Sequence, residues 1–163
     1  VCSSEAKEFF GDEHSVGVQS SARLRGIVLH SILSSVLLPS DFEMALSSAV
    51  EEGLIDSASA LKYHDLLKDR IQAHPEWFPQ EASGCRVLNE QDIIDSDGSV
   101  HRPDRVVIRD GKVRIVDFKF GEPSDRYLRQ LRKYSSLYRR AGYEVEQASV
   151  WYVENDIVVN VEL

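Results

Sequence analysis

The sequence predicts an α/β (α+β) fold in which helices flank a central mixed sheet. Three observations predict this fold. The first half of the chain has helical character, interrupted by proline and glycine. After residue 84 the pattern changes to short apolar runs separated by Asp-Gly pairs, which are strong hairpin signals. One further helical segment then separates these strands from a last pair. The order ααα-βββ-α-ββ in 163 residues indicates one domain of this kind.

The first half of the domain is expected to form three helices, at residues 21–38, 41–53 and 57–74. Pro39 ends the first, because proline cannot continue a helix. Ser40 or Asp41 can cap the second, and Gly53 ends it. An Asp-Ser pair before the third can cap it in the same way. These helices form an N-terminal helical segment, and residues 1–20, which are polar and rich in serine, are interpreted as a linker or arm. The domain therefore covers residues 21–163.

The second half is expected to form five strands, at residues 85–94, 100–110, 112–120, 144–154 and 156–163. Asp97-Gly98 and Asp110-Gly111 supply the turns between the first three. A helix over residues 124–142 follows the third strand and ends at a glycine. Trp77 and Phe78 lie in the loop before the first strand and are interpreted as anchors packed on the body of the domain.

Composition and charge exclude several classes of protein. The two cysteines are too few for a disulfide framework or an iron–sulfur cluster. The chain contains no apolar run of membrane-spanning length and no signal-peptide pattern, so a cytoplasmic protein without membrane contact is expected. It also lacks a GxxxxGK[ST] loop, so we expect no bound nucleotide. The net charge of −8 argues against general attraction to nucleic acid.

The stretch PDRVVIRDGKVRIVDFK carries the strongest functional signal. Its last part should be a central strand, where a charge is costly unless it is paired or binds a metal. Asp117 and Lys119 are two residues apart and therefore share one face of that strand. The turn at Asp110-Gly111 brings Asp104 alongside, so all three side chains are expected to converge. Two carboxylates suit Mg²⁺, and a nearby lysine can orient water or stabilise developing negative charge, which is the chemistry of phosphodiester hydrolysis.

This pattern of Pro-Asp, twelve residues and then Asp-Phe-Lys resembles the PD-(D/E)XK nuclease superfamily. More specifically, the chain resembles the RecB/AddA branch, the nuclease domains at the C-termini of UvrD-like helicases. Further positions carry this resemblance from residue 23 to residue 142: Gly26 and His30 in RGIVLH, Glu90 on the strand before the hairpin, and Gln130 and Tyr134 in RQLRKY. Two features depart from the branch. Phe120 stands where it often has threonine, and the cysteines of its iron–sulfur subgroup are absent.

The resemblance implies a restriction-endonuclease-like fold and a Mg²⁺- or Mn²⁺-dependent deoxyribonuclease. An exonuclease is favoured over an endonuclease, acting on single-stranded DNA or DNA ends in double-strand-break repair and recombination. Helicase domains of the same longer chain, and a second nuclease subunit, are the implied partners. His30, Asp104, Asp117 and the Phe118 carbonyl would hold the metal. Lys119 would position the attacking water.

Several of these residues also have plainer interpretations. His30 could be a core histidine, and Asp104 could pair with Arg102 or Arg105 on the surface. Asp117 and Lys119 could form an ion pair on a solvated face. Glu90 could be a partner of Lys119, a contact to metal-bound water or an ordinary polar position.

The helix over residues 124–142 is the candidate DNA-binding element. Its basic side chains have only Asp125 as a local counter-charge, and they form a candidate phosphate-binding surface: Arg126, Arg129, Arg132, Lys133, Arg139 and Arg140. Gln130 and Tyr134 are one turn apart and could contact the DNA strand, whereas a solvated helix face is the alternative for the basic residues.

Two other functions remain open at this level. A catalytically inactive module with the nuclease fold could bind DNA or brace a subunit, although such copies usually lose one of the three motif residues. An unrelated α+β interaction domain could contain the motif by accident, and its carboxylates would then point in different directions.

Overall fold

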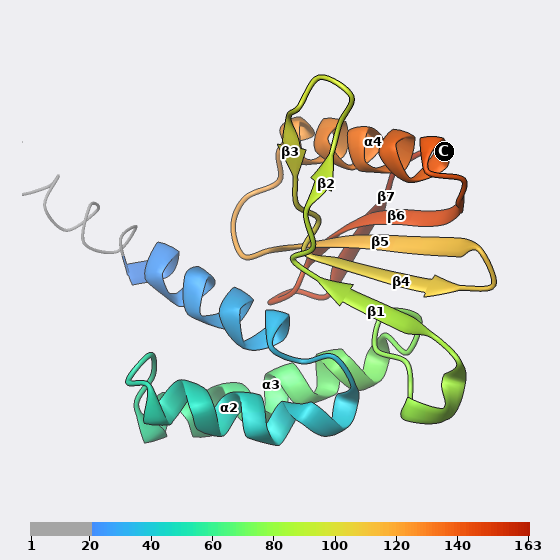
Figure 1. Ribbon diagram of the computed structural model, residues 1–163. Helices are drawn as coiled ribbons and strands as arrows, with labels where there is room; N and C mark the ends of the chain where they lie inside the picture. Colours follow the sequence, from blue (N-terminus) through green and yellow to red (C-terminus); the bar gives the residue numbers. More distant parts are fainter. Residues whose placement is uncertain (1–20) are drawn as a thin grey trace, which may run out of the picture.

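A computed structural model describes residues 21–163 and shows the expected α+β architecture (Figure 1). The predicted arm, residues 1–20, lies outside the described residues. Helix α4 covers one face of a five-stranded sheet, and the N-terminal helix, α2 and α3 lie against the other. The sheet order is β1-β4-β5-β6-β7, and only β5 and β6 are parallel. Within residues 21–163, no helix has the length and apolar character needed to cross a membrane.

The helices lie close to their predicted positions. They are the N-terminal helix at 21–34, α2 at Phe42–Glu51 after the short 3-10 helix η1 at Pro39–Asp41, α3 at Ser57–Ala73 and α4 at Asp125–Arg140. The first ends four residues earlier than predicted. The carbonyls of Val36 and Leu37 accept hydrogen bonds from Arg105, and Asn89 donates to the Ser34 carbonyl. Because these carbonyls are bound by residues of the sheet, the helix ends before Pro39.

The first two predicted strands are each divided in two. The strands are β1 at Arg86–Asn89, β2 at Ile93–Ile94, β3 at Val100–His101, β4 at Arg105–Arg109, β5 at Lys112–Lys119, β6 at Glu144–Tyr152 and β7 at Ile157–Asn160. Glu90 has a φ of 49°, which ends β1. Pro103 separates β3 from β4 and has no N–H for a strand ladder. As a result, β2 and β3 leave the main sheet and form a separate hairpin that stands beside α4 (Figure 1).

Alternate residues of β5 supply the two halves of the core, as predicted. Val116 and Phe118 pack against the N-terminal helix, α2 and α3. Ile115 packs on the opposite face, against α4. Trp77 and Phe78 are fully buried and lie against Trp151, which confirms their interpretation as anchors. The strand that carries Asp117 is therefore the centre of the domain, buried on both faces.

Candidate active site

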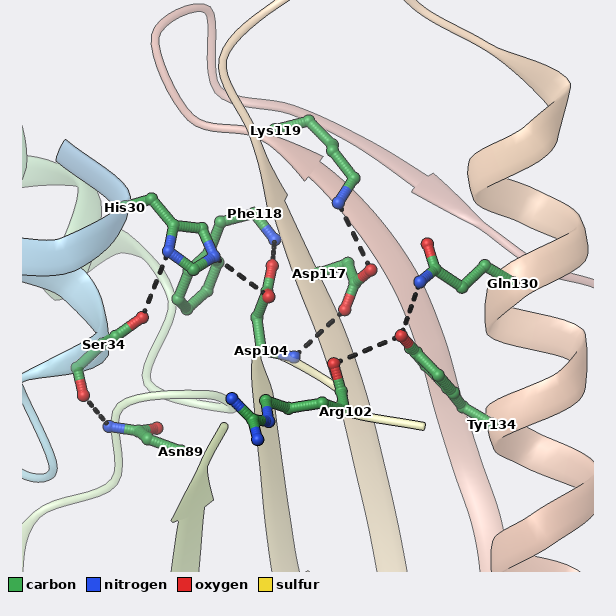
Figure 2. A network of polar contacts seen from close by, with 10 residues as sticks. All are labelled: His30, Ser34, Asn89, Arg102, Asp104, Asp117, Phe118, Lys119, Gln130 and Tyr134. Carbon is green, nitrogen blue, oxygen red and sulfur yellow. Dashed lines mark hydrogen bonds and ion pairs between the residues drawn. The ribbon is translucent and has the colours of Figure 1, made fainter. Parts of the chain in front are cut away.

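Asp104 and Asp117 converge as the hairpin predicted (Figure 2). Arg105 pairs with Val116, so Asp104 lies beside Asp117 where β4 begins. The Asp104 N–H donates to Asp117 Oδ1 over 3.1 Å. The Phe118 N–H donates to Asp104 Oδ2 over 2.7 Å. Each carboxylate is thus oriented by the backbone next to the other, and this arrangement rules out carboxylates that point in different directions.

Lys119 completes the predicted set. Its Nζ lies 3.3 Å from Asp117 Oδ2 and 4.8 Å from the centre of the Tyr127 ring. Its side chain remains partly exposed, whereas that of Asp117 is almost fully buried. This ion pair was one of the plainer interpretations of the two residues, but it does not lie on a solvated face. The lysine reaches solvent at the point where a substrate could approach Asp117.

His30 reaches the same cluster from the N-terminal helix. Its Nε2 lies 3.0 Å from Asp104 Oδ1, its Nδ1 lies 3.4 Å from the Ser34 hydroxyl, and its ring packs edge-on against Phe118. The hydrogen bond to Asp104 raises the pKa of His30 and outweighs the opposing effect of burial. His30 is therefore part of the site rather than an isolated core histidine.

Asp117 is difficult to ionise, because it is buried and lies beside a second carboxylate. Its burial, followed by repulsion from Asp104, raises its pKa from 3.8 to about 6. Lys119 and the Asp104 N–H act in the opposite direction but do not compensate fully. A buried carboxylate that is difficult to ionise next to a second carboxylate is a common arrangement at functional sites. A divalent cation would supply the missing positive charge.

The donor set fits a hard divalent cation. Two carboxylates and one carbonyl leave room for the waters that Mg²⁺ retains. The N–H and C=O of a strand residue point to the same side, so the Phe118 carbonyl faces the side occupied by Asp104. Within residues 21–163, no three His, Cys, Asp or Glu side chains are close enough together to hold an ion as they stand. To bind a metal through Nε2, His30 would have to release the proton that Nε2 donates to Asp104.

Glu90 does not lie on a strand, contrary to the prediction. It follows β1 in a left-handed backbone conformation and is exposed. Its N–H donates to the Asp104 carbonyl over 3.0 Å, so its backbone helps to position the start of β4. Its carboxylate is close enough to raise the pKa of His30. Among the described contacts, none joins its carboxylate to Lys119.

Gln130 and Tyr134 approach the site from α4, but only Gln130 is exposed. Gln130 Nε2 donates to the Tyr134 hydroxyl over 2.6 Å, and that hydroxyl donates to the Arg102 carbonyl over 3.2 Å. Tyr134 is 1% exposed, and its burial raises its pKa. Tyr134 therefore ties α4 to the segment before Asp104, and Gln130 is the member of the pair that is open to solvent.

The basic residues of α4 do not form one free surface. Asp95, on the β2–β3 hairpin, accepts bonds from Lys133 and Arg140. The prediction that Asp125 is the only nearby counter-charge was therefore wrong, because the hairpin folds back onto the helix. These two bonds, with one from the Ser96 N–H, hold the pKa of Asp95 far below its usual range. Lys133 is thereby committed to a structural contact.

The remaining arginines lie on different flanks of α4. Arg126 is one turn before Gln130 and shares its flank, and its guanidinium lies 5.3 Å from the centre of the Tyr127 ring. Lys119 lies against the same ring, so Arg126 is continuous with the site. Arg132 and Arg139 lie on the flank turned away from Gln130, and Arg129 lies on the outer face between the two flanks. All of these arginines are exposed.

Arg105 is a structural residue that the sequence did not reveal. It is fully buried and donates to the carbonyls of Trp77, Val36 and Leu37 and to the Asn89 side chain. Its burial lowers its pKa to about 9. It neighbours Asp104 but does not pair with it, and Arg102 pairs with Asp92 instead, so neither arginine is the partner that the plainer interpretation of Asp104 required. The only available signal was its position inside an apolar strand run.

Comparison with known proteins adds no family assignment. The chain matches no family model and no curated protein.

Proposed function

We propose that residues 21–163 form a metal-dependent DNA nuclease domain of the PD-(D/E)XK type, related to the nuclease domains of RecB/AddA helicase–nucleases. The observation that carries the proposal is the reciprocal backbone bonding of Asp104 and Asp117, which holds two carboxylates together beside Lys119. The alternative of an accidental motif predicted carboxylates that diverge. The fold itself supports the α+β framework that such a domain requires.

In this proposal each residue has a defined role. Asp104, Asp117 and the Phe118 carbonyl would hold Mg²⁺ or Mn²⁺, with His30 as a further ligand. The cation would polarise the phosphoryl oxygen and lower the pKa of bound water. Lys119, which reaches both Asp117 and solvent, orients the attacking water and stabilises the negative charge that develops on the phosphate. Gln130 and Arg126 contact the DNA strand beside this point.

The wider setting follows from the same proposal. The domain would cleave single strands or DNA ends, as an exonuclease rather than an endonuclease. Helicase domains of a longer chain would deliver the strand during double-strand-break repair and recombination in the cytoplasm. A second nuclease subunit would act on the other strand.

Metal binding and cleavage together test the proposal. Calorimetry with Mn²⁺ should show binding to the wild-type protein and strongly weakened binding to Asp117→Asn. The wild-type protein should degrade single-stranded DNA with Mg²⁺ but not with a chelator, whereas Asp117→Asn should be inactive while remaining folded by circular dichroism. Equal Mn²⁺ binding by both proteins would exclude the metal site. Metal binding without cleavage would instead favour a catalytically inactive module with the same fold.

A further inference from the structure

An open apolar groove lies immediately beside Lys119. It has a volume of about 510 Å³ and runs between the N-terminal helix and the end of β5. Gly26 and Ile27 line it on the helix side, and Phe118 and Phe120 line it on the strand side. Ile27 is 57% exposed although it is apolar. The groove is therefore an apolar surface directly continuous with the candidate active site.

Phe120 gives this groove an aromatic wall. A Cβ atom at Gly26 would lie 3.1 Å from Phe120 Cβ, closer than most real contacts, so glycine at this position lets Phe120 lie directly against the helix. Phe120 packs against the main core cluster but remains partly exposed. Threonine, which is common here in the branch that the chain resembles, would provide no ring. The aromatic wall is thus a property of this chain.

Two basic residues border the groove, and only one of them directs its charge toward it. Arg23 borders it on the N-terminal helix. Lys119 borders it at the end of β5, but the Lys119 ammonium is turned to Asp117 and the Tyr127 ring on the other face of the strand. Arg23 is exposed and makes no ion pair with any residue from 21 to 163. His30 also lines the groove and contacts Asp104, so the groove leads directly to the carboxylates. An apolar, aromatic floor with an arginine at one edge and the candidate phosphate site at the other is complementary to a nucleotide, whose flat base is linked to a charged backbone.

We propose that this groove binds one unpaired base of the substrate strand, next to the phosphate held at Asp104, Asp117 and Lys119. The inference rests on the proposed nuclease function and narrows its substrate to single-stranded or unpaired DNA. The faces of a base within a duplex are covered by its neighbours, so a duplex cannot place one against Phe120 without unstacking it. Stacking on an aromatic ring tolerates every base, so the groove selects strandedness rather than sequence.

A comparison of two oligonucleotides, one with bases and one without, tests directly whether the groove binds a base. Measurements use the Asp117→Asn chain, in which cleavage is blocked, and fluorescence anisotropy compares oligothymidylate with a fully abasic strand of the same length. One stacked base corresponds to roughly 5- to 150-fold in affinity. We expect the abasic strand to bind about tenfold more weakly, with an unchanged salt slope because its phosphates are the same. Equal affinity, or no binding of either strand, would overturn the inference.

Substitutions at Phe120 separate stacking from apolar packing. Phe120→Tyr keeps the ring and should bind oligothymidylate as the parent does. Phe120→Leu keeps an apolar side chain against Gly26 but removes the ring, and should lose about tenfold in affinity for oligothymidylate and none for the abasic strand. Leu61→Ala is the control, because Leu61 is 78% exposed on α3 and does not line the groove. An effect of Leu61→Ala equal to that of Phe120→Leu would contradict a specific site.

Steady-state cleavage distinguishes failure of this inference from failure of the proposed function. In the otherwise wild-type chain, Phe120→Leu should raise KM for single-stranded DNA about tenfold and leave kcat unchanged, since stacking is the same in the ground and transition states. An unchanged KM with active enzyme would overturn only the base-binding groove. Absence of Mn²⁺ binding and of cleavage in the wild-type protein would overturn the nuclease function, and the binding comparison would still decide whether the groove holds a base.

Discussion

Arg105 and Asp117 are two buried charged residues on adjacent strands, and their surroundings compensate their charges to different extents. The Arg105 guanidinium is fully buried, but three backbone carbonyls and the Asn89 side chain accept its hydrogen bonds, and it lies 4.1 Å from the centre of the Phe78 ring. Asp117 is 2% exposed and receives one backbone N–H and one lysine, while a second carboxylate lies beside it. Oxygen acceptors surround the cation, whereas the anion faces another anion.

This difference separates a structural charge from one that is available for chemistry. The acceptors of Arg105 come from three separate segments, so the charge joins the N-terminal helical layer to the sheet. The cluster around Asp117 has too little positive charge, which a bound cation could correct. Buried charge alone therefore does not identify a functional site. The balance of charge and hydrogen bonds around it does.

The largest effect is expected from removal of the structural charge. Arg105→Ala leaves the carbonyls of Val36, Leu37 and Trp77 without a donor and opens a cavity, so it should destabilise the fold by about 3–5 kcal/mol. Arg109→Ala is the matched control on the same strand, because Arg109 is exposed, and it should change stability by less than about 1 kcal/mol. Urea unfolding measures both. Similar midpoints for the two variants would show that Arg105 does not join the layers.

The second-largest effect is expected for Lys119→Ala, and it should appear in the rate of DNA cleavage rather than in the stability of the fold. Lys119→Ala should leave Mn²⁺ affinity nearly unchanged but lower the cleavage rate on the order of 10²-fold or more, because it removes charge stabilisation in the transition state. Single-turnover cleavage and calorimetry measure the two quantities. If the rate stays within a few fold of wild type while the melting temperature falls, Lys119 serves only as a partner of Asp117.

The metal-free protein should lose stability as pH rises. Asp117 has a raised pKa of about 6 in the folded state, so its neutral form stabilises the fold at low pH, and this contribution falls between about pH 4 and 6. His30 also has a raised pKa, so its contribution is present below 6.5 and is lost as pH rises through its folded value. The Asp117 shift corresponds to about 2–3 kcal/mol.

Urea unfolding at pH 5 and pH 8 in a chelator measures this loss. Asp117→Asn should be the more stable protein at pH 8, and Mn²⁺ should raise the stability of the wild-type protein but not of the variant. A metal-free stability that increases from pH 5 to pH 8 would contradict the charge imbalance at the site.

The smallest effect distinguishes the two flanks of α4. Arg126→Ala and Arg132→Ala remove the same charge, but only Arg126 lies on the flank of Gln130 and beside the Tyr127 ring. We expect Arg126→Ala to weaken binding of single-stranded DNA and reduce its salt slope by about 1, with little change for Arg132→Ala. Equal losses would mean that the strand contacts the whole helix or that only net charge matters.

Local patterns were sufficient to predict most of the fold and the central motif. Asp110-Gly111 sets the register of the β4–β5 hairpin, and this register alone places Asp104 beside Asp117. Alternation along β5 places Asp117 and Lys119 on one face. Glycine and aspartate signals bounded the helices to within a few residues, and the N-terminal helix was the exception because its end depends on bonds from Arg105 and Asn89.

The roles of several site residues could not be predicted in this way. Lys133 was assigned to DNA, but it pairs with Asp95, which is 38 residues away and reaches α4 only because β2 and β3 leave the sheet. Tyr134 has a helical position that fits either a surface or a core role, and the packing of α4 on the sheet buried it. The break at Glu90 depends on a positive φ in a non-glycine residue, for which the local sequence contains no strong signal.

The sequence by itself determined that Asp104, Asp117 and Lys119 stand together, because turn chemistry and strand alternation are local properties. Tertiary structure alone decided which charges are neutralised, since this depends on segments far apart in the chain. Arg105 donates hydrogen bonds to the carbonyls of residues 36, 37 and 77. Lys133 and Arg140 both pair with Asp95 of the β2–β3 hairpin. Asp117 is left with a carboxylate neighbour and a partly exposed lysine, and only this long-range distribution of partners separates the candidate site from the other buried charges.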